Sequence, residues 1–398
     1  MSVLPFSKAE FQARVKNVKK CMVEKKLDVL ILSDPANLNY VGGYDALSYY
    51  VPQVVIVAQD LEEPVAIIRL QDHFCATESC WMSKDNIIPY PDKYLWEPMK
   101  MHVLDFVADF LKSKGLDKKR YGLEMDSFYM PAQWYQRLCS QLPNAQFVDS
   151  EKLVNWVRGP KSPQELEYMA IAARHSEKAM HDAVALMADG VRECDVAAQI
   201  LHSLVAGNGL YGGDLSCLPP IIPAGERTAG AHFSWTTEGK YKDGQVVYME
   251  ISGVYKRYHS PLTRTVFVGK PHQKIIDTAS AVVEGLNAVI DYIKPGVVAE
   301  DVEKLWQTTI NKYGFHKESR CGYCVGIGFP PVWCEDTLYF KPGEKSIVKP
   351  GMTFHMMPGL WLDGYGVAIT ETLRVTEHGC ESITKFPRKL LSTDDYSI

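Results

Sequence analysis

The chain has 398 residues, of which 46% are hydrophobic and 23% are charged; these values exclude a disordered chain and predict two or three domains. The formal net charge of −5 gives no electrostatic reason to expect a nucleic acid or an anionic membrane as a partner. The 10 cysteines are too few for a disulfide scaffold, and we find neither a secretory signal nor an apolar run of transmembrane length. We therefore expect a reduced protein of the cytoplasm.

Helix and strand signals alternate in the first part of the chain. A capping box at Ser7–Glu10, followed by apolar residues at helical spacing, predicts a helix that ends near Lys26. Short apolar runs predict strands at 27–32, 54–57, 65–68 and around Leu123, and amphipathic stretches predict helices at 101–114 and 131–142. This alternation is typical of an α/β domain of about 155 residues.

A second domain is predicted to begin near Gly159-Pro160, because Ser162–Glu165 combines an N-cap, a first-turn proline and a capping-box acid. Beyond it, the pattern Gly190-Val191 to Asp195-Val196 recurs as Gly296-Val297 to Asp301-Val302. In each half, this repeated pattern lies after a long predicted helix and at the start of a second predicted helix. We interpret this as an internal duplication with pseudo-twofold symmetry and an active site between the halves.

Nucleotide-binding and zinc-binding signatures are absent or weak. The sequence has no Walker loop and no G-x-G-x-x-G after a strand, which argues against binding of nucleotide phosphates. Cys321 and Cys324 form a single C-x-x-C without a second pair, so two buried thiols are a better interpretation than zinc ligands.

One acid interrupts a strand-like apolar run at Val246–Ile251. A carboxylate inside such a run is expected to be paired or functional, because an unpaired buried charge costs several kcal/mol. Glu250 is therefore either a partner of an ion pair, with Arg264 as one option, or a site residue.

The motifs around this acid resemble the creatinase/prolidase/methionine aminopeptidase superfamily over essentially the whole chain. The segments that carry the resemblance are 246–251, 258–265, 351–359 and 366–372. It implies an α+β protein: a pita-bread catalytic domain with pseudo-twofold duplication at 159–398, preceded by a smaller α/β domain at 1–158.

The resemblance also implies where metal ligands would lie. In the metallopeptidases of this family five side chains hold two metal ions, and their positions fall here on Glu250, Pro261, Tyr323, Met357 and Thr370. Four of these residues are not the hard carboxylate and imidazole ligands of such a centre. We therefore expect no metal and no other cofactor.

A metal-free precedent within the family is creatinase, which acts on a guanidinium, and its upstream catalytic histidine matches His232. The finer pattern is similar to ectoine hydrolases in segments 257–262, 330–333, 352–355 and 369–372. That resemblance implies hydrolysis of the cyclic amidine ring of ectoine, or of 5-hydroxyectoine, to N-acetyl-L-2,4-diaminobutyrate. Creatine hydrolysis, an inactive module that binds peptides or partners, and a metallopeptidase with displaced ligands remain alternatives.

Site roles follow from this resemblance together with residue chemistry. The predicted catalytic residues are Glu250, as nucleophile or as the group that orients the cation, with His232 and Glu371 as acid/base groups; a strand-end salt bridge is the alternative for Glu371. The predicted substrate-binding residues are His355, Tyr323, Trp333, Arg69 and Arg320, with one of the two arginines holding the carboxylate of a small zwitterion. The family also implies a homodimer in which the N-terminal domain reaches the neighbouring subunit's site.

Overall fold

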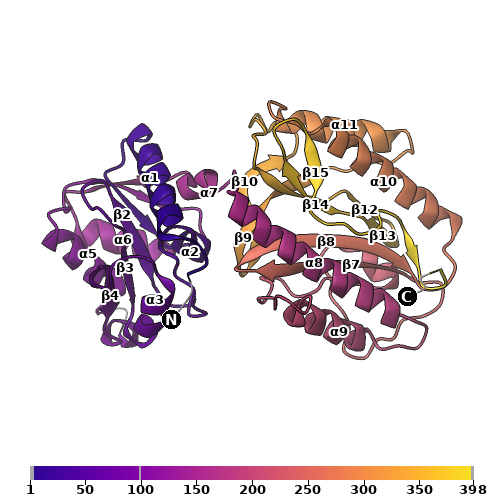
Figure 1. Cartoon of the computed structure of the whole chain (residues 1–398), viewed down its shortest axis with the longest axis horizontal. Helices are drawn as coiled ribbons and strands as arrows, with labels where there is room; N and C mark the ends of the chain where they lie inside the picture. Colours follow the sequence, from indigo (N-terminus) through magenta and orange to yellow (C-terminus); the bar gives the residue numbers. More distant parts are fainter. Residues whose placement is uncertain (1–3, 98–99, 396–398) are drawn as a thin grey trace. The chain divides into compact units, whose positions relative to one another are not determined.

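A computed structural model describes residues 4–97 and 100–395 of the chain. These residues form two compact units, and the chain passes from the first to the second between Arg158 and Gly159 (Figure 1). No helix in the described ranges is both long and apolar enough to cross a membrane.

The first unit is a six-stranded mixed sheet flanked by helices. Its strand order is β4-β3-β2-β1-β5-β6, with β1 antiparallel to β2, β2 antiparallel to β3 and the other neighbours parallel. The strands are β1 (Val29–Leu32), β2 (Val54–Ala58), β3 (Val65–Arg69), β4 (Ile87–Tyr90), β5 (Arg120–Leu123) and β6 (Gln146–Asp149). The helices are α1 (Lys8–Glu24), α2 (Pro35–Gly42), α3 (His73–Ser79), α4 (Lys93–Trp96), α5 (Val103–Ser113), α6 (Ala132–Gln141) and α7 (Leu153–Val157), with short 3-10 turns η1 (Leu70–Asp72) and η2 (Lys84–Asn86).

The predicted local signals of this unit are confirmed. The Ser7 hydroxyl caps α1 by accepting a hydrogen bond from the Glu10 amide. Strands β1 and β2 are buried along their whole length, as continuous apolar runs predict for the centre of a sheet.

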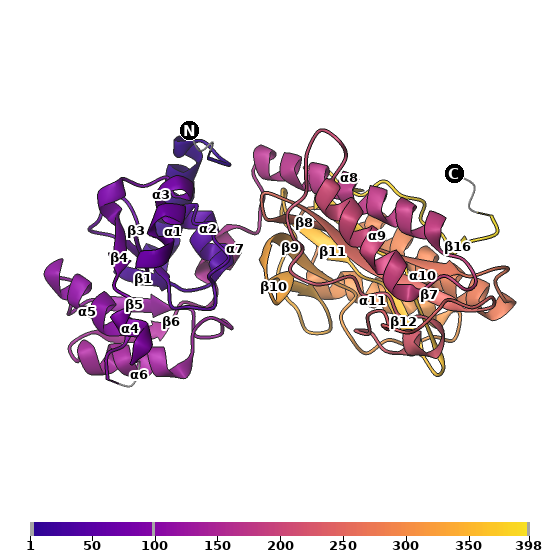
Figure 2. The ribbon, with the colours of Figure 1, turned by 90° about the horizontal axis from the view of Figure 1, so that it is seen from below.

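The second unit contains two long helix pairs and a strongly curved set of strands (Figures 1 and 2). Its helices are α8 (Pro163–Leu186), α9 (Glu193–Ala206), α10 (Gln273–Tyr292) and α11 (Ala299–Asn311), with the 3-10 turn η3 (Gly225–Ala229). Its strands are β7 (Val246–Tyr255), β8 (Tyr258–Phe267), β9 (Gly322–Phe329), β10 (Val332–Phe340), β11 (Thr353–Met356), β12 (Gly359–Leu362), β13 (Tyr365–Ala368), β14 (Glu371–Val375), β15 (Cys380–Ser382) and β16 (Leu391–Ser392). Eight of these strands form one sheet, along the path β15-β14-β11-β9-β8-β16 with β10 beside β9 and β7 beside β8; β12 and β13 form a separate ribbon.

The two halves of this unit repeat the same local design. Gly190 and Gly296 both adopt a positive φ, of 80° and 90°, in the turn that joins the two helices of their half. The amide of Gly190 donates to the Tyr241 carbonyl and that of Gly296 to the Val348 carbonyl, each at 2.9 Å. The predicted internal duplication is therefore confirmed in backbone hydrogen bonding as well as in helix order.

Each helix pair covers its own strands with apolar side chains. Helices α8 and α9 pack on β7 and β8 through one buried cluster, and α10 and α11 pack on β9, β10, β11 and β14 through another. Cys321 and Cys324 belong to the second cluster, and all 10 cysteines of the chain lie in the described residues as free thiols. The interpretation of the C-x-x-C as two buried thiols is confirmed.

Candidate active site

A cavity of about 550 Å³ opens on the side of β7 that faces away from α8 and α9. Its lining residues are Leu218, Ile221, Ala231, His232, Glu250, Ser319, Arg320, Tyr323, Val332, Trp333, Cys334, Lys341, Met357 and Trp361. Five of the eight predicted site residues are therefore brought together, from segments between positions 232 and 333.

Strand alternation explains why Glu250 faces this cavity. Val247, Met249 and Ile251 point into the core beneath α8 and α9, so Tyr248 and Glu250 point to the opposite side. The Glu250 side chain is 7% exposed. Burial raises the pKa of its carboxyl to about 7, against the opposing influence of the positive charges of Lys317 and Arg320.

Lys317 is a buried lysine next to the cavity wall that no sequence pattern indicated. Its Nζ donates to the Met357 carbonyl at 3.1 Å and lies 4.7 Å from the ring centroid of Trp361. Burial lowers the pKa of this amine to about 8, while the charges of Cys321 and Glu250 act in the other direction. A lysine in a polar loop before β9 carries no pattern in the sequence, and only the fold shows that it is buried beside a carboxylate.

Two cations line the cavity wall itself. Arg320 is half-buried, with its guanidinium 4.7 Å from the ring centroids of both Tyr323 and Tyr339, and Lys341 is exposed. The cavity thus presents one buried carboxylate and several positive groups, which is the charge pattern expected for a zwitterionic ligand.

His232 lies in a loop, whereas the sequence suggested a strand-like segment. Two carbonyl contacts fix this loop: the Tyr248 hydroxyl donates to the Gly230 carbonyl at 2.7 Å, and the Ser234 hydroxyl donates to the Pro220 carbonyl at 2.5 Å. The His232 side chain is exposed and lines the cavity, so it can exchange protons with solvent as an acid/base group must.

Tyr323 and Trp333 line the cavity and His355 lies behind them. The indole of Trp333 donates to the Tyr323 hydroxyl at 2.8 Å, and this hydroxyl is 2.8 Å from His355 Nδ1. His355 is fully buried and is not among the residues that line the cavity, so its position gives no support to a direct contact with substrate. His355 pairs with Tyr323 across β11 and β9, so both side chains lie on the same face of the sheet, with their ring centroids 5.3 Å apart.

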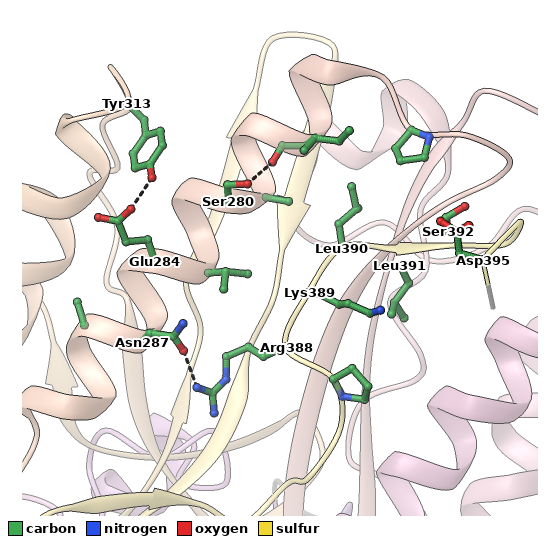
Figure 3. A pocket seen from close by; sticks show the side chains of 16 residues that line it. Ser280, Glu284, Asn287, Tyr313, Arg388, Lys389, Leu390, Leu391, Ser392 and Asp395 are labelled. Carbon is green, nitrogen blue, oxygen red and sulfur yellow. Dashed lines mark hydrogen bonds between the residues drawn. The ribbon is translucent and has the colours of Figure 1, made fainter. Parts of the chain in front are cut away.

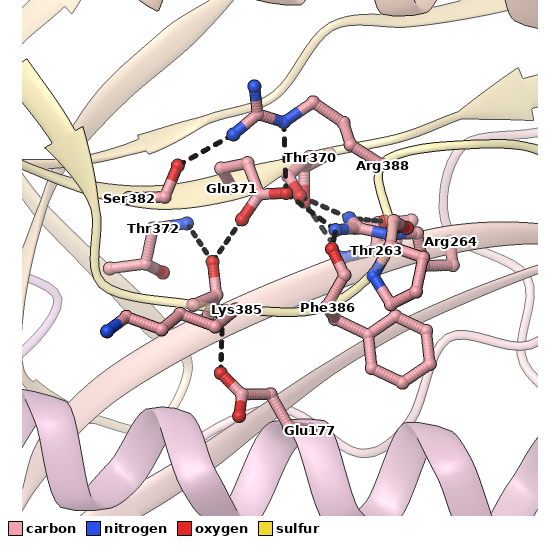
Figure 4. Close-up of polar contacts among 12 residues, drawn as sticks. Glu177, Thr263, Arg264, Thr370, Glu371, Thr372, Ser382, Lys385, Phe386 and Arg388 are labelled. Carbon is pink, nitrogen blue, oxygen red and sulfur yellow. Dashed lines mark hydrogen bonds and ion pairs between the residues drawn. The ribbon is translucent and has the colours of Figure 1, made fainter.

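Glu371 is also not a cavity residue. Its Oε1 accepts from Arg264 Nη2 at 2.5 Å and from Arg388 Nε at 3.3 Å, and its Oε2 accepts from the Thr384 hydroxyl (Figure 4). Both oxygens are thus occupied in a buried network, and the Glu371 side chain is 1% exposed. The acid/base role predicted for Glu371 is therefore replaced by the alternative interpretation, a structural ion pair, and Arg264 pairs with this residue instead of with Glu250.

Arg69 does not line the described cavity either. In the first unit its Nε and Nη2 donate to the two carboxylate oxygens of Asp92, at 2.9 and 3.3 Å. This bidentate pair occupies the guanidinium face that would hold a substrate carboxylate. Of the two predicted arginines, the one beside Glu250 in this chain is Arg320.

The donor set does not fit a dinuclear metal centre. Pro261 and Met357 have no side-chain oxygen, the hydroxyls of Tyr323 and Thr370 are engaged in hydrogen bonds within the chain, and Glu250 is the one carboxylate of the five positions. No group of three His, Cys, Asp or Glu side chains in the described ranges could hold a metal ion. Hard divalent cations need several oxygen or imidazole ligands, which these positions do not offer.

A second cavity, of about 980 Å³, lies between α10 and the segment 387–395 (Figure 3). Its polar side chains are largely paired: the Tyr313 hydroxyl donates to Glu284, and Arg388 donates to Asn287 at 2.6 Å. None of the predicted site residues lines it, so the chemistry of this chain is assigned to the first cavity.

Sequence comparison identifies both units. Residues 14–159 match the creatinase/prolidase N-terminal domain, and residues 167–377 match metallopeptidase family M24. The chain is 38% identical to the ectoine hydrolase of Halomonas elongata, over 97% of this chain and 98% of that protein. It is 40% identical to an uncharacterized hydrolase/peptidase of Sinorhizobium fredii, over 99% of this chain and 100% of that protein.

Solved structures match the whole chain as well. The dipeptidase PepE of Mycobacterium ulcerans superimposes with a TM-score of 0.82 at 22% identity, covering 98% of this chain and 99% of its own. A dipeptidase of Pyrococcus horikoshii superimposes with a TM-score of 0.80 at 21% identity, covering 95% and 99%. At these identities the matches concern the fold alone. They confirm the predicted architecture, in which a smaller α/β domain is followed along the chain by a duplicated α+β domain.

Proposed function

The chain belongs to metallopeptidase family M24, in the branch with a creatinase/prolidase N-terminal domain, and is a hydrolase; on that premise we propose that it opens the cyclic amidine ring of ectoine without a metal ion. The proposed product is N-acetyl-L-2,4-diaminobutyrate, and 5-hydroxyectoine is the second proposed substrate. The relationship to the Halomonas elongata enzyme supports this choice of substrate.

The observation that carries the proposal is the pairing of one buried carboxylate with nearby cations in a small cavity. Glu250 matches an amidinium, which a carboxylate binds through two hydrogen bonds, and Arg320 with Lys317 or Lys341 matches the substrate carboxylate. The ring of Trp361 supplies an apolar face for the substrate ring.

The reaction needs little beyond these groups. An amidinium carbon already carries positive charge, so it accepts a nucleophile without the Lewis acid that a neutral peptide bond requires. The oxygen of water adds to this carbon beside Glu250, a ring C–N bond breaks, and the leaving nitrogen takes a proton. His232 is the proposed carrier of protons between solvent and the reacting atoms.

Product identification tests the substrate. We expect purified protein to convert ectoine to N-acetyl-L-2,4-diaminobutyrate, followed by mass spectrometry or proton NMR. Release of urea from creatine, with ectoine left intact, would instead support the creatinase alternative. If neither is converted and the cavity retains a peptide, the chain is the inactive binding module.

Metal independence has its own test. We expect activity to survive dialysis against a chelator, because the family's ligand positions hold Pro261 and Met357 among others. Metal analysis of the purified protein is expected to give far less than one ion per chain. Two stoichiometric ions together with inhibition by the chelator would contradict the proposal and favour a metallopeptidase with displaced ligands.

We also propose that the active form is a homodimer. The cavity reaches the surface at His232, the neighbouring Phe233 is 53% exposed, and Val332 in the cavity wall is 37% exposed. Large exposed apolar side chains beside a site mouth are typical of an interface. Sedimentation equilibrium should give about twice the chain mass of 44.8 kDa, and a monomer that turns over substrate would contradict this proposal.

A further inference from the structure

A continuous hydrogen-bonded chain runs from the cavity wall into the core of the second unit. Trp333 Nε1 lies 2.8 Å from the Tyr323 hydroxyl, which lies 2.8 Å from His355 Nδ1. His355 Nε2 lies 2.8 Å from the Thr370 hydroxyl, and the Thr263 amide donates to the same hydroxyl at 2.8 Å. Two of its members, Tyr323 and Thr370, stand at positions where the family's metallopeptidases have metal ligands.

Both ends of this chain have a fixed direction. An indole N–H and a backbone N–H can only donate, so the Tyr323 oxygen accepts from Trp333 and the Thr370 oxygen accepts from Thr263. Between them His355 is neutral, because its burial lowers its pKa to about 3 and the charges of Arg320 and Lys317 add to this effect. A neutral imidazole carries one N–H and one lone pair, so two tautomers remain.

Hydrogen-bond accounting separates the two tautomers. With the proton on Nε2, His355 would donate to Thr370, whose own hydroxyl hydrogen would then have no acceptor among the described residues although Thr370 is fully buried. Leaving a buried donor unsatisfied costs about 1–3 kcal/mol. With the proton on Nδ1, Thr370 donates to Nε2 and His355 donates to Tyr323. The hydrogen that then has no acceptor among the described residues is that of the Tyr323 hydroxyl, and because Tyr323 lines the cavity, water or a ligand can accept it there.

We infer that His355 carries its proton on Nδ1, so that the Tyr323 hydroxyl accepts two hydrogen bonds and donates its own hydrogen into the cavity. Tyr323 lines the same cavity as Glu250, whose charge acts on the tyrosine hydroxyl. Tyr323 is then a catalytic residue and His355 a positioning residue that fixes its orientation. The position of Tyr323, where the family's metallopeptidases have a metal ligand, thus holds a hydrogen-bond donor that points into the cavity.

The role of this donor rests on the proposed function. Water adds to the amidinium carbon through an electron pair of its oxygen and forms a tetrahedral intermediate with a hydroxyl group. When that hydroxyl loses its proton, negative charge develops on the oxygen, which becomes the carbonyl oxygen of the product as the ring C–N bond breaks and the leaving nitrogen takes a proton. A tyrosine whose pKa burial raises well above its usual value keeps its proton and stabilises that oxygen by hydrogen bonding alone. Glu250 would then contact the amidinium nitrogens of the substrate, and Tyr323 would contact the oxygen that comes from water.

Two variants of His355 separate the tautomers, because the amide nitrogen of asparagine overlies Nδ1 and that of glutamine overlies Nε2. We expect Tyr323→Phe to lose about 10²–10³-fold in kcat with little change in KM, as removal of one such donor does. His355→Gln should lose a similar factor, and His355→Asn should be at least tenfold more active than His355→Gln. The reverse order of the two His355 variants would overturn the inference.

A measurement without substrate tests the tautomer of His355 independently of the proposed function. Protein labelled with ¹⁵N-histidine reports the tautomer of each imidazole by long-range proton–nitrogen correlation, and the His355 signals are those lost in His355→Asn. We expect Nδ1–H in the unmodified protein, whether or not ectoine is a substrate. An Nε2–H signal for His355 would refute the tautomer, whereas failure to convert ectoine would refute only the proposed function.

Discussion

A carboxylate with a pKa near 7 lines the cavity, and a buried amine with a pKa near 8 contacts two residues of the cavity wall, Met357 and Trp361. Glu250 and Lys317 each favour the charged form of the other, yet burial keeps both near neutrality. Groups poised near the working pH are what proton-transfer chemistry requires.

Replacing this carboxylate is the sharpest single-residue test. We expect Glu250→Gln to lower kcat/KM by more than about 10³-fold, because an amide neither pairs with an amidinium nor assists addition to its carbon. The same change removes a buried charge, so the free energy of unfolding should stay within about 1 kcal/mol or rise. Steady-state kinetics and urea unfolding of the same preparation check this; an active variant would contradict the assignment.

The pH dependence of kcat/KM should be bell-shaped. Its rising limb is expected near pH 7, where Glu250 loses its proton and can pair with the cation, and its falling limb near pH 8, where Lys317 loses its charge and with it the attraction for a carboxylate. Lys317→Met should remove the falling limb and leave the rising one. A profile that is flat from pH 6 to pH 9 in the unmodified enzyme would contradict both roles.

The sequence can predict a site residue only where a local pattern indicates it. Glu250 could be identified from the sequence because a single acid in an apolar strand is expected to be either paired or functional. Glu371 was predicted as a site residue because it adjoins Thr370, which stands at a ligand position of the family. The two side chains make different contacts: Thr370 bonds to His355, and Glu371 belongs to the ion-pair network. Lys317 and the link from Tyr323 to His355 arise from tertiary contacts, which no local pattern encodes.

At the scale of elements, the Arg264–Glu371 pair joins segments that are distant along the chain. Arg264 in β8 also donates to the carbonyls of Thr370, Phe386 and Pro387, at 2.6, 2.8 and 2.6 Å, and so ties the C-terminal segment to the sheet (Figure 4). Its guanidinium is fully buried. The network therefore holds strands β8 and β14 together beside the site without entering it.

Breaking this pair should destabilise the second unit without removing its chemistry. We expect Glu371→Gln to lower the free energy of unfolding by about 3–5 kcal/mol, because Arg264 would remain buried without its counter-charge. The folded fraction should keep kcat within about tenfold, since Glu371 does not line the cavity.

The matched control lies on the same strand. Arg374 pairs with Glu381 at the surface, with side chains 44% and 47% exposed, and Arg374→Gln should cost less than about 1 kcal/mol. Urea unfolding of both variants gives the comparison. A Glu371→Gln protein that is as stable as Arg374→Gln but has lost its activity would restore the acid/base role.

The elements themselves were largely predictable, because capping and periodicity are local. The capping box at Ser162 and Glu165 is present, and it begins the long helix α8, which ends at Leu186. The duplicated turns could be predicted from Gly190 and Gly296, since positive φ favours glycine. How the two halves close around the cavity depends on long-range pairing, such as that of β9 with both β8 and β11, and only the resemblance to a known fold anticipated it.

At the scale of the whole molecule, buried titratable groups of both signs control the response to acid. Burial raises the pKa values of Glu124 in the first unit and Glu250 in the second to about 7, and lowers those of His259 and His355 to about 3. The carboxyls take up protons more readily when folded, so their stabilising effect is complete below their unfolded pKa near 4.3 and is lost as the pH rises through 7. The histidines behave in the opposite way: their effect is complete above 6.5 and is lost as the pH falls towards 3.

These opposing effects predict a plateau followed by a steep loss. Between about pH 6.5 and 4.5 the two carboxyls and the two histidines offset each other, and the free energy of unfolding should change little. Below about pH 4.3 the carboxyls are protonated in both states, so the histidines act alone, with a loss of up to about 2.7 kcal/mol per pH unit for two protons. Exposed ion pairs add a further loss of stability at low pH.

A variant of one histidine distinguishes the contribution of that histidine from the contribution of the ion pairs. His259→Asn keeps a donor for the Arg257 carbonyl, which lies 3.0 Å from His259 Nδ1, and it removes one titrating group. Urea midpoints at pH 4.5, 4.0 and 3.5 should therefore fall less steeply in His259→Asn, by up to about 1.4 kcal/mol per pH unit, and identical slopes would show that His259 is already protonated in the folded protein.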